Sequence, residues 1–571
     1  MIVLLKRVSV ENFRGLQSVA LALDRNTVLI GENNSGKTTL LEAIRLCLGR
    51  SLSRRNNLFE DHDYHLPSST SRPGDAGNLT ITLDFAEETP DEWAAEIVQD
   101  LGDVIVLQTE AQGDIRHVTM RVESHFDKPT GDFVTDWDFL DSTGNPIPKG
   151  KRPQYLSTLQ RLSPVFYLTA LRDAATQFQA KSTFWAPFLR NPSIPPNVQK
   201  ELEEELIELN DKILNAETRL KQVKANLSKA QDIVSLSKTD TVSIEALPTK
   251  VWEMLSRAQV NVAGTTGASI PLAKHGAGTQ SLSVMFLFQA YLEADLGRLD
   301  KLSEPILGLE EPEAHLHPAA IRALWSTLNT LKGQKIIATH SGDLLSQVPL
   351  SNVRRFRRIG GKIEVCQLKP GTLGDDELRK IHFHIKRTRG ELLFARCWLL
   401  GEGETEYWVF SQSAEILGVD LERAGIRTVD YAQAGVLPFT KLADDLGIAW
   451  HAVVDGDAAG KTNQQTLRGQ LNGRQEQEHI SPLPQDNVEL FLCESGYGSI
   501  YEKHISQQKK KNLTAKQGDP NYWRQVLDCQ SRVPKATRAI EVMTAMKQKG
   551  KKGVPPLLAQ ILERCSALAA R

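Results

Sequence analysis

The sequence offers little that would place the protein in a membrane or in an oxidising compartment. Hydrophobic residues make up 40% of the 571 residues, but there is no apolar run of about 18 residues, so we expect no membrane span. Residues 1–5 are apolar, but Lys6 and Arg7 follow at once and leave no signal-peptide core. The six cysteines form no CxxC pair, and their spacing fits neither zinc ligation nor a disulfide framework. We therefore expect a cytoplasmic protein.

The sequence also lacks an excess of charge of either sign. A formal net charge of -2 excludes a chain that is basic throughout, so any nucleic-acid surface must be a local patch. The stretch 508–552 is rich in lysine, notably at Lys509–Lys511 and within 547–552. These lysines form either a solvated face or a set of phosphate contacts. At about 150 residues per domain, the length predicts several domains.

A phosphate-binding loop is the clearest motif present. Residues 31–38, GENNSGKT, match the pattern GxxxxGK[ST] between a short apolar strand at 27–30 and a helical pattern at 39–48. Glycines let the backbone curl so that its N–H groups face phosphates. Lys37 would neutralise the β- and γ-phosphate oxygens, and the Thr38 hydroxyl would hold Mg²⁺. The predicted nucleotide-binding residues here are Asn33, Asn34, Ser35, Gly36, Lys37, Thr38 and Thr39.

Two later strands end in residues that suit ATP hydrolysis. The apolar segment 305–309 ends in Glu310 and Glu311. Glu310 would reach Mg²⁺ through water, and Glu311 would orient or deprotonate the attacking water. His340 follows another short apolar strand and could contact the γ-phosphate. The alternatives are an acidic helix cap and a structural histidine.

A second anion site is predicted at residues 275–281, HGAGTQS, which lead into an apolar helix. Its candidate ligands for nucleotide are Gly276, Gly278 and Gln280. Two phosphate sites in one chain suggest a nucleotide shared between protomers, in which the loop of one protomer faces residues 276–281 of the other. The alternative is an ordinary helix cap.

Residues 202–234 carry a heptad pattern. Ten apolar positions recur at alternating steps of four and three, from Leu202 to Val234, flanked by Glu and Lys. The pattern predicts either an amphipathic helix packed on its own domain or a helical hairpin or coiled coil that mediates dimerisation. No obvious turn marks where a hairpin would reverse.

From residue 390 onward a new β-α-β-α-β pattern begins, after a polar stretch at 370–377 that we expect to be a linker. Strand 397–401 leads into Glu402 and Glu406, and strand 450–454 leads into Asp455 and Asp457, with a further strand at 426–431 between them. Right-handed parallel crossovers would bring these carboxylates to one sheet edge. Clustered carboxylates require cations, and oxygen-only ligation favours Mg²⁺ or Mn²⁺, as in two-metal phosphoryl transfer. Each motif alone could be a common loop or an acidic helix start.

These motifs resemble those of known families. ENFRG at 11–15, NTVLIGENNSGKTTLLEAI at 26–44 and LEEPEAHLHP at 309–318 resemble the SMC/RecF-like branch of ABC-type ATPases, in which the position of Arg14 lies near the nucleotide. The C-terminal pattern resembles a Toprim domain. The combination resembles the OLD (overcoming lysogenization defect) family of ATP-dependent nucleases, most specifically at RTRGELLFARCWLLGEGETE (387–406) and VVDGDAAG (453–460).

The resemblance implies an α/β architecture with an ABC-type ATPase domain at 1–375, a helical and dimerising insertion at about 190–245, and a Toprim nuclease domain with a C-terminal helical extension at 385–571. By order in the chain, Glu489 fits a further metal ligand of the family. Lys552 fits a catalytic lysine that stabilises charge on the scissile phosphate, with Lys551 as the competing choice.

The function implied is an ATP-regulated, divalent-metal-dependent DNA endonuclease in antiphage defence or DNA processing. The expected cofactors are ATP and Mg²⁺, with Mn²⁺ as an option at the Toprim site. The expected partners are DNA, a second or further copies of the chain, and in some systems a helicase-like protein or a nucleoprotein. The alternatives are an ATP-driven DNA-repair clamp and a topoisomerase- or primase-like Toprim protein.

Overall fold

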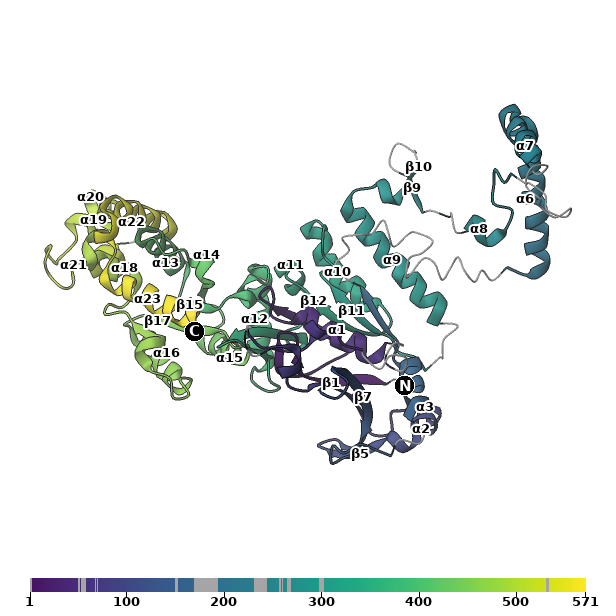
Figure 1. Cartoon of the computed structure of the whole chain (residues 1–571). Coiled ribbons are helices and arrows are strands. Elements are labelled where there is room, and N and C mark those ends of the chain that lie inside the picture. Colours follow the sequence, from purple (N-terminus) through teal and green to yellow (C-terminus); the bar gives the residue numbers. More distant parts are fainter. Residues whose placement is uncertain are drawn as a thin grey trace. The chain divides into compact units, whose positions relative to one another are not determined.

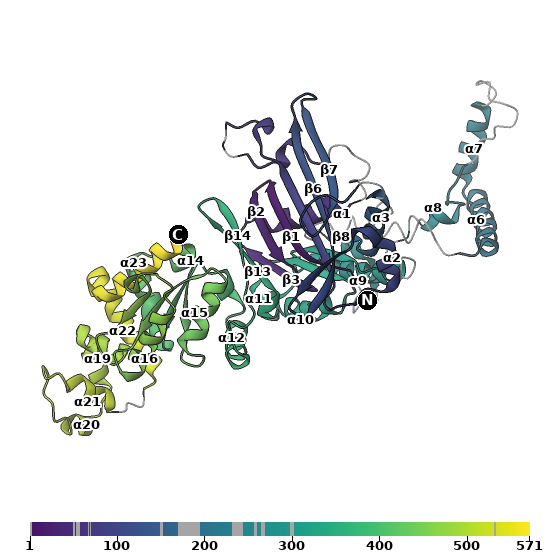
Figure 2. The same cartoon turned by 90° about the horizontal axis from the view of Figure 1, so that it is seen from below.

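The structure is a computed structural model (Figures 1 and 2). It describes the residue ranges 3–49, 52, 58–66, 68, 70–148, 152–168, 194–230, 244–255, 258, 260–263, 269–296, 302–529 and 533–571. These residues form two compact units. The first comprises Met1–Tyr167, Glu304–Glu311 and Pro318–Arg571, and the second comprises Leu168–Ser303 and Pro312–His317. None of the helices within the described ranges is long and apolar enough to cross a membrane.

The first unit begins with an antiparallel sheet in the order β2-β1-β4-β6-β5, with β7 paired to β6. Side chains along these strands alternate between buried and exposed, because successive residues of a strand point to opposite faces of the sheet. Val8 and Val10, for example, are fully buried. Residues 106–127 form two of these strands, which are joined by a turn at residues 111–112. The strands are β1 (Leu4–Phe13), β2 (Leu16–Ala22), β4 (Leu79–Ala86), β5 (Val106–Glu110), β6 (Gly113–Asp127) and β7 (Asp132–Leu140).

A second sheet carries the phosphate-binding loop and has the order β14-β13-β3-β12-β11-β8. Its strands β13, β3, β12 and β11 are parallel, so their carboxyl ends meet at one edge. The strands are β3 (Asn26–Gly31), β8 (Val165–Leu168), β11 (Ile306–Glu310), β12 (Gln334–Ala338), β13 (Val353–Ile359) and β14 (Lys362–Cys366). The helices of this part are α1 (Lys37–Leu48), α2 (Ala95–Leu101), α3 (Arg152–Leu162), α10 (Pro318–Thr330) and α11 (Gly342–Leu345).

The third sheet of the first unit confirms the predicted β-α-β-α-β pattern. Its four strands are all parallel, in the order β16-β15-β17-β18. They are β15 (Cys397–Gly401), β16 (Ile426–Asp430), β17 (Ala449–Val454) and β18 (Ile480–Pro482). The connecting helices are α13 (Glu404–Leu417), α14 (Leu421–Ala424), α15 (Val436–Asp445), α16 (Ala458–Gly469) and α17 (Glu476–His479).

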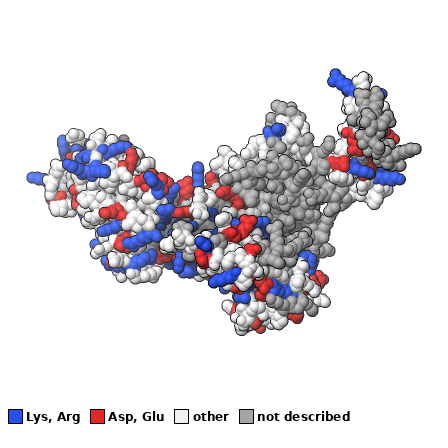
Figure 3. Space-filling model, in the orientation of Figure 1, with Lys and Arg blue, Asp and Glu red and all other residues white. Residues whose placement is uncertain are grey.

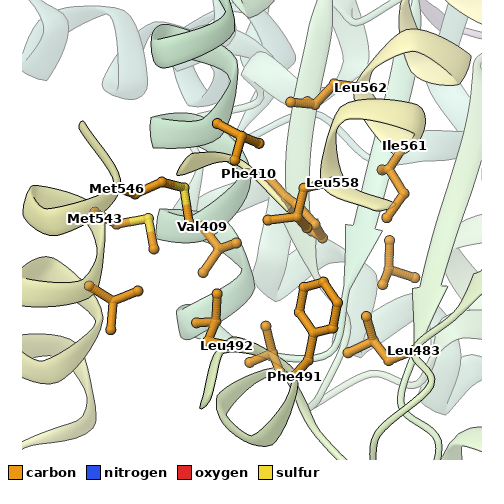
Figure 4. Close-up of a cluster of buried hydrophobic side chains, with 14 of the residues drawn as sticks. Val409, Phe410, Leu483, Phe491, Leu492, Met543, Met546, Leu558, Ile561 and Leu562 are labelled. Atoms are coloured by element: carbon orange, nitrogen blue, oxygen red, sulfur yellow. The ribbon is translucent and has the colours of Figure 1, made fainter. Parts of the chain in front are cut away.

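The C-terminal helices share one core with this sheet. Figure 4 shows Met543 and Met546 beside Val409 of α13, with Leu558 and Leu562 packed from another helix. All of these side chains are almost completely buried. The C-terminal extension therefore belongs to the core of the third sheet rather than forming a separate tail. Its helices are α18 (Val488–Leu492), α19 (Gly498–Lys503), α20 (Gln507–Lys511), α21 (Tyr522–Asp528), α22 (Lys535–Lys549) and α23 (Pro556–Ala570).

The expected linker at 370–377 is only partly a linker. Gly371 has a φ of 80° and forms a turn, but residues 375–377 already lie in the first turn of α12 (Asp375–Arg387). Acidic side chains stabilise the positive end of the helix dipole there. Helix α12 packs on α15 through the Lys441–Glu377 ion pair at 3.2 Å and a contact between the rings of His384 and Phe439.

The second unit holds the heptad segment as two helices, α6 (Pro196–Ala216) and α7 (Thr218–Ala230), which are separated at Glu217. The heptad is therefore not one continuous helix. On α6 the side chain of Asn210 is buried, and its amide oxygen accepts hydrogen bonds from the N–H groups of Ala246 and Leu247 at 2.8 and 3.2 Å. Val234 lies outside the described residues. The remaining elements are α8 (Val251–Leu255), β9 (Asn261–Ala263), β10 (Ser269–Pro271) and α9 (Ala277–Leu296).

Candidate functional site

The phosphate-binding loop has the backbone its sequence requires. Gly31, Asn34 and Gly36 all have positive φ values, of 148°, 60° and 94°. A Cβ atom on Gly31 would lie 2.4 Å from the carbonyl oxygen of Phe356, so only glycine fits there. Lys37 is buried, and its amino group donates to the carbonyl oxygens of Gly31 at 3.0 Å and Glu32 at 2.9 Å. Burial lowers the pKa of Lys37 to about 8, against the opposing effect of nearby carboxylates.

Glu310, Glu311 and His340 lie at the same sheet edge as the loop. Glu310 ends β11 and Glu311 follows it, while His340 comes two residues after β12. Glu311 has a φ of 43°, a strained value that marks functional positions in many proteins. Burial and Lys37 lower the pKa of His340, and Glu311 raises it. The three side chains predicted for hydrolysis are thus brought together around Lys37.

Tyr167 is a neighbour of Glu310 that the sequence did not reveal. Its hydroxyl is hydrogen-bonded to the Glu310 carboxylate, and burial followed by this carboxylate raises the pKa of Tyr167. The other carboxylate oxygen, Oε1 of Glu310, is buried and has no hydrogen-bond partner among the described residues. A buried, unpaired carboxylate oxygen beside a phosphate-binding loop fits a Mg²⁺ site, because Mg²⁺ prefers oxygen ligands.

Arg14 has a local partner in the structure. It lies in the tight turn between β1 and β2 with a φ of 50°, and its Nε donates to Oδ1 of Asp63 at 2.7 Å. About two fifths of its side chain is exposed (38%), so it can still meet a ligand. Its contact with nucleotide remains a prediction.

The predicted second anion site lies in the second unit, at the start of α9. The side-chain amide of Gln280 donates to the carbonyl oxygen of His275 at 2.7 Å. A Cβ atom on Gly278 would lie 2.9 Å from the carbonyl oxygen of His315, so a larger residue would be difficult to place. Gly276 is exposed. That these residues face the loop of another protomer remains a prediction.

Four of the five predicted metal-binding carboxylates line one pocket of about 260 Å³ in the Toprim half. Glu402 follows β15 and Asp455 follows β17, while Glu406 and Glu489 lie in the first turns of α13 and α18. The N–H of Gly403 donates to Oε2 of Glu406 at 3.1 Å. The Thr405 hydroxyl donates to Oε1 of Glu489 at 3.4 Å. Three segments that are distant in sequence, around residues 402–406, 455 and 489, thus bring their acids to one place.

The carboxylates in this pocket disfavour one another's charge. Burial raises the pKa of Asp455 to about 8, and Glu402, Glu406, Asp457 and Glu489 contribute in the same direction. Burial followed by Asp457 raises the pKa of Glu402, and burial followed mainly by Glu489 raises that of Glu406. A bound cation would remove this conflict.

The donor set therefore fits a divalent cation. Oε2 of Glu402 is buried with no hydrogen-bond partner among the described residues. In the described part of the chain, no three carboxylate, histidine or cysteine side chains are already spaced around a single ion position. Binding would require the side chains to rotate inward, which short movements of glutamate rotamers can provide.

Asp457 and Lys552 lie outside the lining of this pocket. Asp457 is the N-cap of α16, and its Oδ1 accepts the N–H of Gly460 at 2.7 Å. Lys552 and Lys551 are both exposed, in the short helical turn Gly550–Gly553 between α22 and α23. The choice between the two lysines, and the metal role of Asp457, remain predictions.

The motifs did not indicate Asn487, which lines the pocket, or Tyr431, which lies beside it. Asn487 lines it and caps α18, where its side chain accepts the N–H of Leu490 at 2.8 Å. An asparagine directly before an apolar helix is a recognisable capping signal. Tyr431 follows β16, and its buried hydroxyl donates to the carbonyl oxygen of Val453 at 3.1 Å. Burial, followed by Glu402 and Asp455, raises the pKa of Tyr431.

Two family models match the chain. Residues 3–391 match the model described as protein of unknown function (DUF2813), and residues 393–457 match the model described as overcoming lysogenization defect protein-like, TOPRIM domain. The chain is 31% identical to the uncharacterized protein YbjD of Escherichia coli (strain K12), with 99% of both chains covered. It is 25% identical to the Old nuclease of Escherichia phage P2, and the match covers 80% of this chain and 78% of that nuclease. It is 21% identical to the endonuclease GajA of Bacillus cereus (strain VD045), with 88% and 84% covered.

Proposed function

The chain belongs to the OLD family, and we propose that it is an ATP-binding and ATP-hydrolysing, divalent-metal-dependent DNA endonuclease that acts in antiphage defence or DNA processing. The observation that carries this proposal is the pocket of Glu402, Glu406, Asp455 and Glu489. The name of the P2 relative supports a nuclease, and that of GajA supports an endonuclease.

The Toprim pocket would hold the metal ions of the nuclease. Glu402, Glu406, Asp455 and Glu489 are the ligands we propose, with Asp457 close enough to affect the charge of two of them. Bound divalent ions would supply a Lewis acid and lower the pKa of water. Thr405 and the N–H of Gly403 hold two of the carboxylates in place. Lys552 would stabilise negative charge on the scissile phosphate.

The ATPase site would use the residues gathered at the edge of the second sheet. The loop 31–38 would bind the phosphates, with Lys37 as their cation and Thr38 and Glu310 on the Mg²⁺ side. Glu311 would orient the attacking water, and His340 would contact the γ-phosphate. Gly276, Gly278 and Gln280 of a second protomer would complete the site, which makes a homodimer the smallest active form we propose.

We place the domain boundary between 375 and 385, with the ATPase at 1–375 and the Toprim nuclease at 385–571. The two family matches change over between residues 391 and 393, close to this boundary. Helix α12 crosses it and packs on α15 of the Toprim half. The helical insertion at about 190–245 is the element we propose for dimerisation.

DNA would be held in part by the C-terminal helices. Figure 3 shows lysine and arginine side chains gathered over the region in which Figure 1 labels α19, α20 and α22. In the last turn of α20, Lys509 and Lys511 are exposed, whereas Lys510 is half-buried and pairs with Glu502 at 3.2 Å. Such a surface would bind phosphates and make DNA binding weaken as salt concentration rises.

A topoisomerase function is less well supported. Topoisomerase chemistry requires a tyrosine nucleophile. Tyr431, beside the pocket, is buried, and its hydroxyl donates a hydrogen bond to the carbonyl oxygen of Val453. Burial and two carboxylates also raise its pKa, which opposes formation of the reactive phenolate.

A cleavage assay tests the proposal. Supercoiled and linear DNA are incubated with Mg²⁺ or Mn²⁺, with and without ATP. We expect the wild-type chain to cut in the presence of metal, and Asp455→Asn to cut at least about 100-fold more slowly. The matched control is Asp528→Asn, the same change at an exposed position of α21. DNA that stays intact with the wild type under all conditions, or normal cutting by Asp455→Asn, would contradict the nuclease function.

A further inference from the structure

A second cavity, of about 850 Å³, lies within the first unit between strand β13 and the Toprim half. One wall is formed by residues 355–359 of β13 together with the first two residues of the phosphate-binding loop. The other wall comes from Phe394 and Arg396 just before β15, from residues 443–449, from residues 473–479 and from the end of α23. We call this cavity the arginine groove, because six arginines line it: Arg355, Arg357, Arg358, Arg396, Arg474 and Arg571.

The acidic side chains of the groove are already paired. Glu32 accepts from Arg396 at 2.6 Å, and Glu478 forms an ion pair with Arg571 at 2.8 Å. Asp444 accepts two hydrogen bonds from Arg474, at 2.7 and 2.8 Å. Each of the three lining carboxylates thus neutralises one arginine, which leaves none of them to pair with the three arginines of β13.

The arginines of β13 meet mainly backbone carbonyls. Nη2 of Arg358 donates to the carbonyl oxygen of Asn34 at 3.0 Å, and Nη1 of Arg357 donates to that of Gly447. Arg357 also lies 3.7 Å from Glu364, which is outside the groove, and its Nε is buried with no hydrogen-bond partner among the described residues. The cavity wall therefore presents positive charge that no lining carboxylate balances.

Arg355 adds a cation in the interior. Its side chain is 7% exposed, and its guanidinium donates to the carbonyl oxygens of Leu393, Ala395, Leu446 and Gly447 at 2.7 to 3.2 Å. Burial lowers the pKa of Arg355 to about 10, because its charged form is removed from water. A buried cation without a counter-ion is costly, and an anion in the groove would offset that cost.

From this charge imbalance, we propose that the arginine groove binds a phosphate-bearing polyanion at a site distinct from the phosphate-binding loop. Guanidinium groups match phosphate oxygens in geometry and charge. The volume falls in the range of small-ligand sites, about 300–1,000 Å³. The groove shares only Gly31 and Glu32 with the loop, and neither Lys37 nor Thr38 lines it. The site requires neither ATP hydrolysis nor DNA cleavage, so it goes beyond the proposed function.

The location gives such a ligand access to both activities. Arg396 lies directly before β15, whose other end leads into Glu402, and its ion pair partner Glu32 is the second residue of the phosphate-binding loop. An anion that competes with Glu32 for Arg396 would therefore act on the loop and on the strand that carries a Toprim carboxylate.

Calorimetry with inorganic tripolyphosphate tests this site. The full chain carries Lys37→Ala to weaken binding at the loop, and no divalent metal is added. We expect Arg357→Gln/Arg358→Gln on this background to bind about tenfold or more weakly, because two charged phosphate contacts are lost. The matched control is Arg423→Gln/Arg427→Gln, which removes the same charge outside the groove and should leave affinity unchanged.

Arg357 also donates a hydrogen bond to the carbonyl oxygen of Gly447, so its replacement could weaken binding by disturbing the fold. A second variant, at a residue with little structural role, separates the two effects. Arg571→Gln changes a side chain that is 61% exposed at the end of the helix α23, and it should also weaken binding. Absence of tripolyphosphate binding, or equal affinity in the groove variants and the control, would overturn the proposal.

A competition arm identifies the source of the phosphates. If a short single-stranded DNA displaces tripolyphosphate, the groove binds a nucleic-acid backbone. If it does not, the groove binds a free small polyanion. Both outcomes support a phosphate site in the groove, and neither depends on cleavage activity, so failure of the nuclease assay would leave this result intact.

Discussion

Asp455 lies among four other carboxylates, and its proton should control how the metal-free protein responds to pH. Its pKa is about 8 in the folded chain, above the ordinary value of 3.8. The folded state therefore binds this proton more tightly than the unfolded state does, and stability falls as pH rises from about 4 to about 8. We predict that Asp455→Asn raises the melting temperature of the metal-free protein at pH 8.5 but changes it little at pH 5.

Metal binding provides the second half of this prediction. Ions compete with protons for the carboxylates, so Mn²⁺ or Mg²⁺ should raise the melting temperature of the wild type more at pH 8.5 than at pH 6. The shift is measured by scanning fluorimetry, with Asp528→Asn as the exposed control. Equal metal shifts at both pH values in the wild type would contradict the charge conflict in the pocket.

Glu311 and Lys37 should separate ATP hydrolysis from ATP binding. Glu311 lies beside His340 and Lys37 but is proposed to act only on the attacking water. Glu311→Gln should slow ATP hydrolysis by about 100-fold or more while ATP still binds. Lys37→Ala should lose both binding and hydrolysis, because the phosphates lose their cation. Phosphate release and nucleotide-binding measurements decide this, and hydrolysis by Glu311→Gln at the wild-type rate would remove Glu311 from the mechanism.

The motifs predict some residues of the two sites and miss others for a physical reason. Glu310, Glu402 and Asp455 were found because each ends or follows an apolar strand, and parallel strands bring such ends together. Tyr167 and Tyr431 were not found, because their contacts arise from tertiary packing and no spacing in the chain marks them. Asp457 was predicted as a ligand, yet in the structure its side chain caps α16, a role that short acidic residues take equally well.

At the scale of elements, periodicity predicted the strands and helices of the Toprim half closely, and the heptad less well. Strand 397–401 appears as expected, since a buried parallel strand has a strong apolar pattern. The heptad runs through Glu217, where the helix is interrupted. Its regular spacing could not reveal that Asn210 is bonded to residues 246 and 247, a contact made 36 residues away in the chain.

The apolar row of α6 and α7 should mediate self-association. Leu209 and Val223 are 46% and 47% exposed, which is unusual for a heptad seam. We predict that Leu209→Asp/Val223→Asp lowers the mass of the assembly in analytical ultracentrifugation, since two charges would be buried in the interface. Asn215→Asp/Gln222→Asp places the same charges on exposed positions of these helices and should leave the mass unchanged. An unaltered mass for the seam variant would exclude the seam from the interface.

At the scale of the whole molecule, two adjacent arginines of β13 serve different parts of the first unit. The Arg354 side chain stays in the N-terminal part, where it bonds the carbonyl of Ala22 and pairs with Asp24 at 2.7 Å. The Arg355 side chain instead bonds four carbonyls of segments that lead into the Toprim strands β15 and β17. Adjacent residues of a strand point to opposite faces, which explains the difference.

We therefore predict that Arg355→Leu uncouples the unfolding of the two parts, whereas Arg354→Leu does not. Loss of the Arg355 side chain leaves buried carbonyls unpaired, at about 1–3 kcal/mol each. In calorimetry, ATP should raise the melting temperature of the whole first unit in the wild type. In Arg355→Leu it should raise only the transition of the ATPase part, and the Toprim part should melt separately at a lower temperature. Arg354→Leu removes a buried arginine of the same strand and should lower stability without splitting the transition. If Arg355→Leu still melts together with its ATPase part, communication between ATP and the nuclease must run through contacts other than β13.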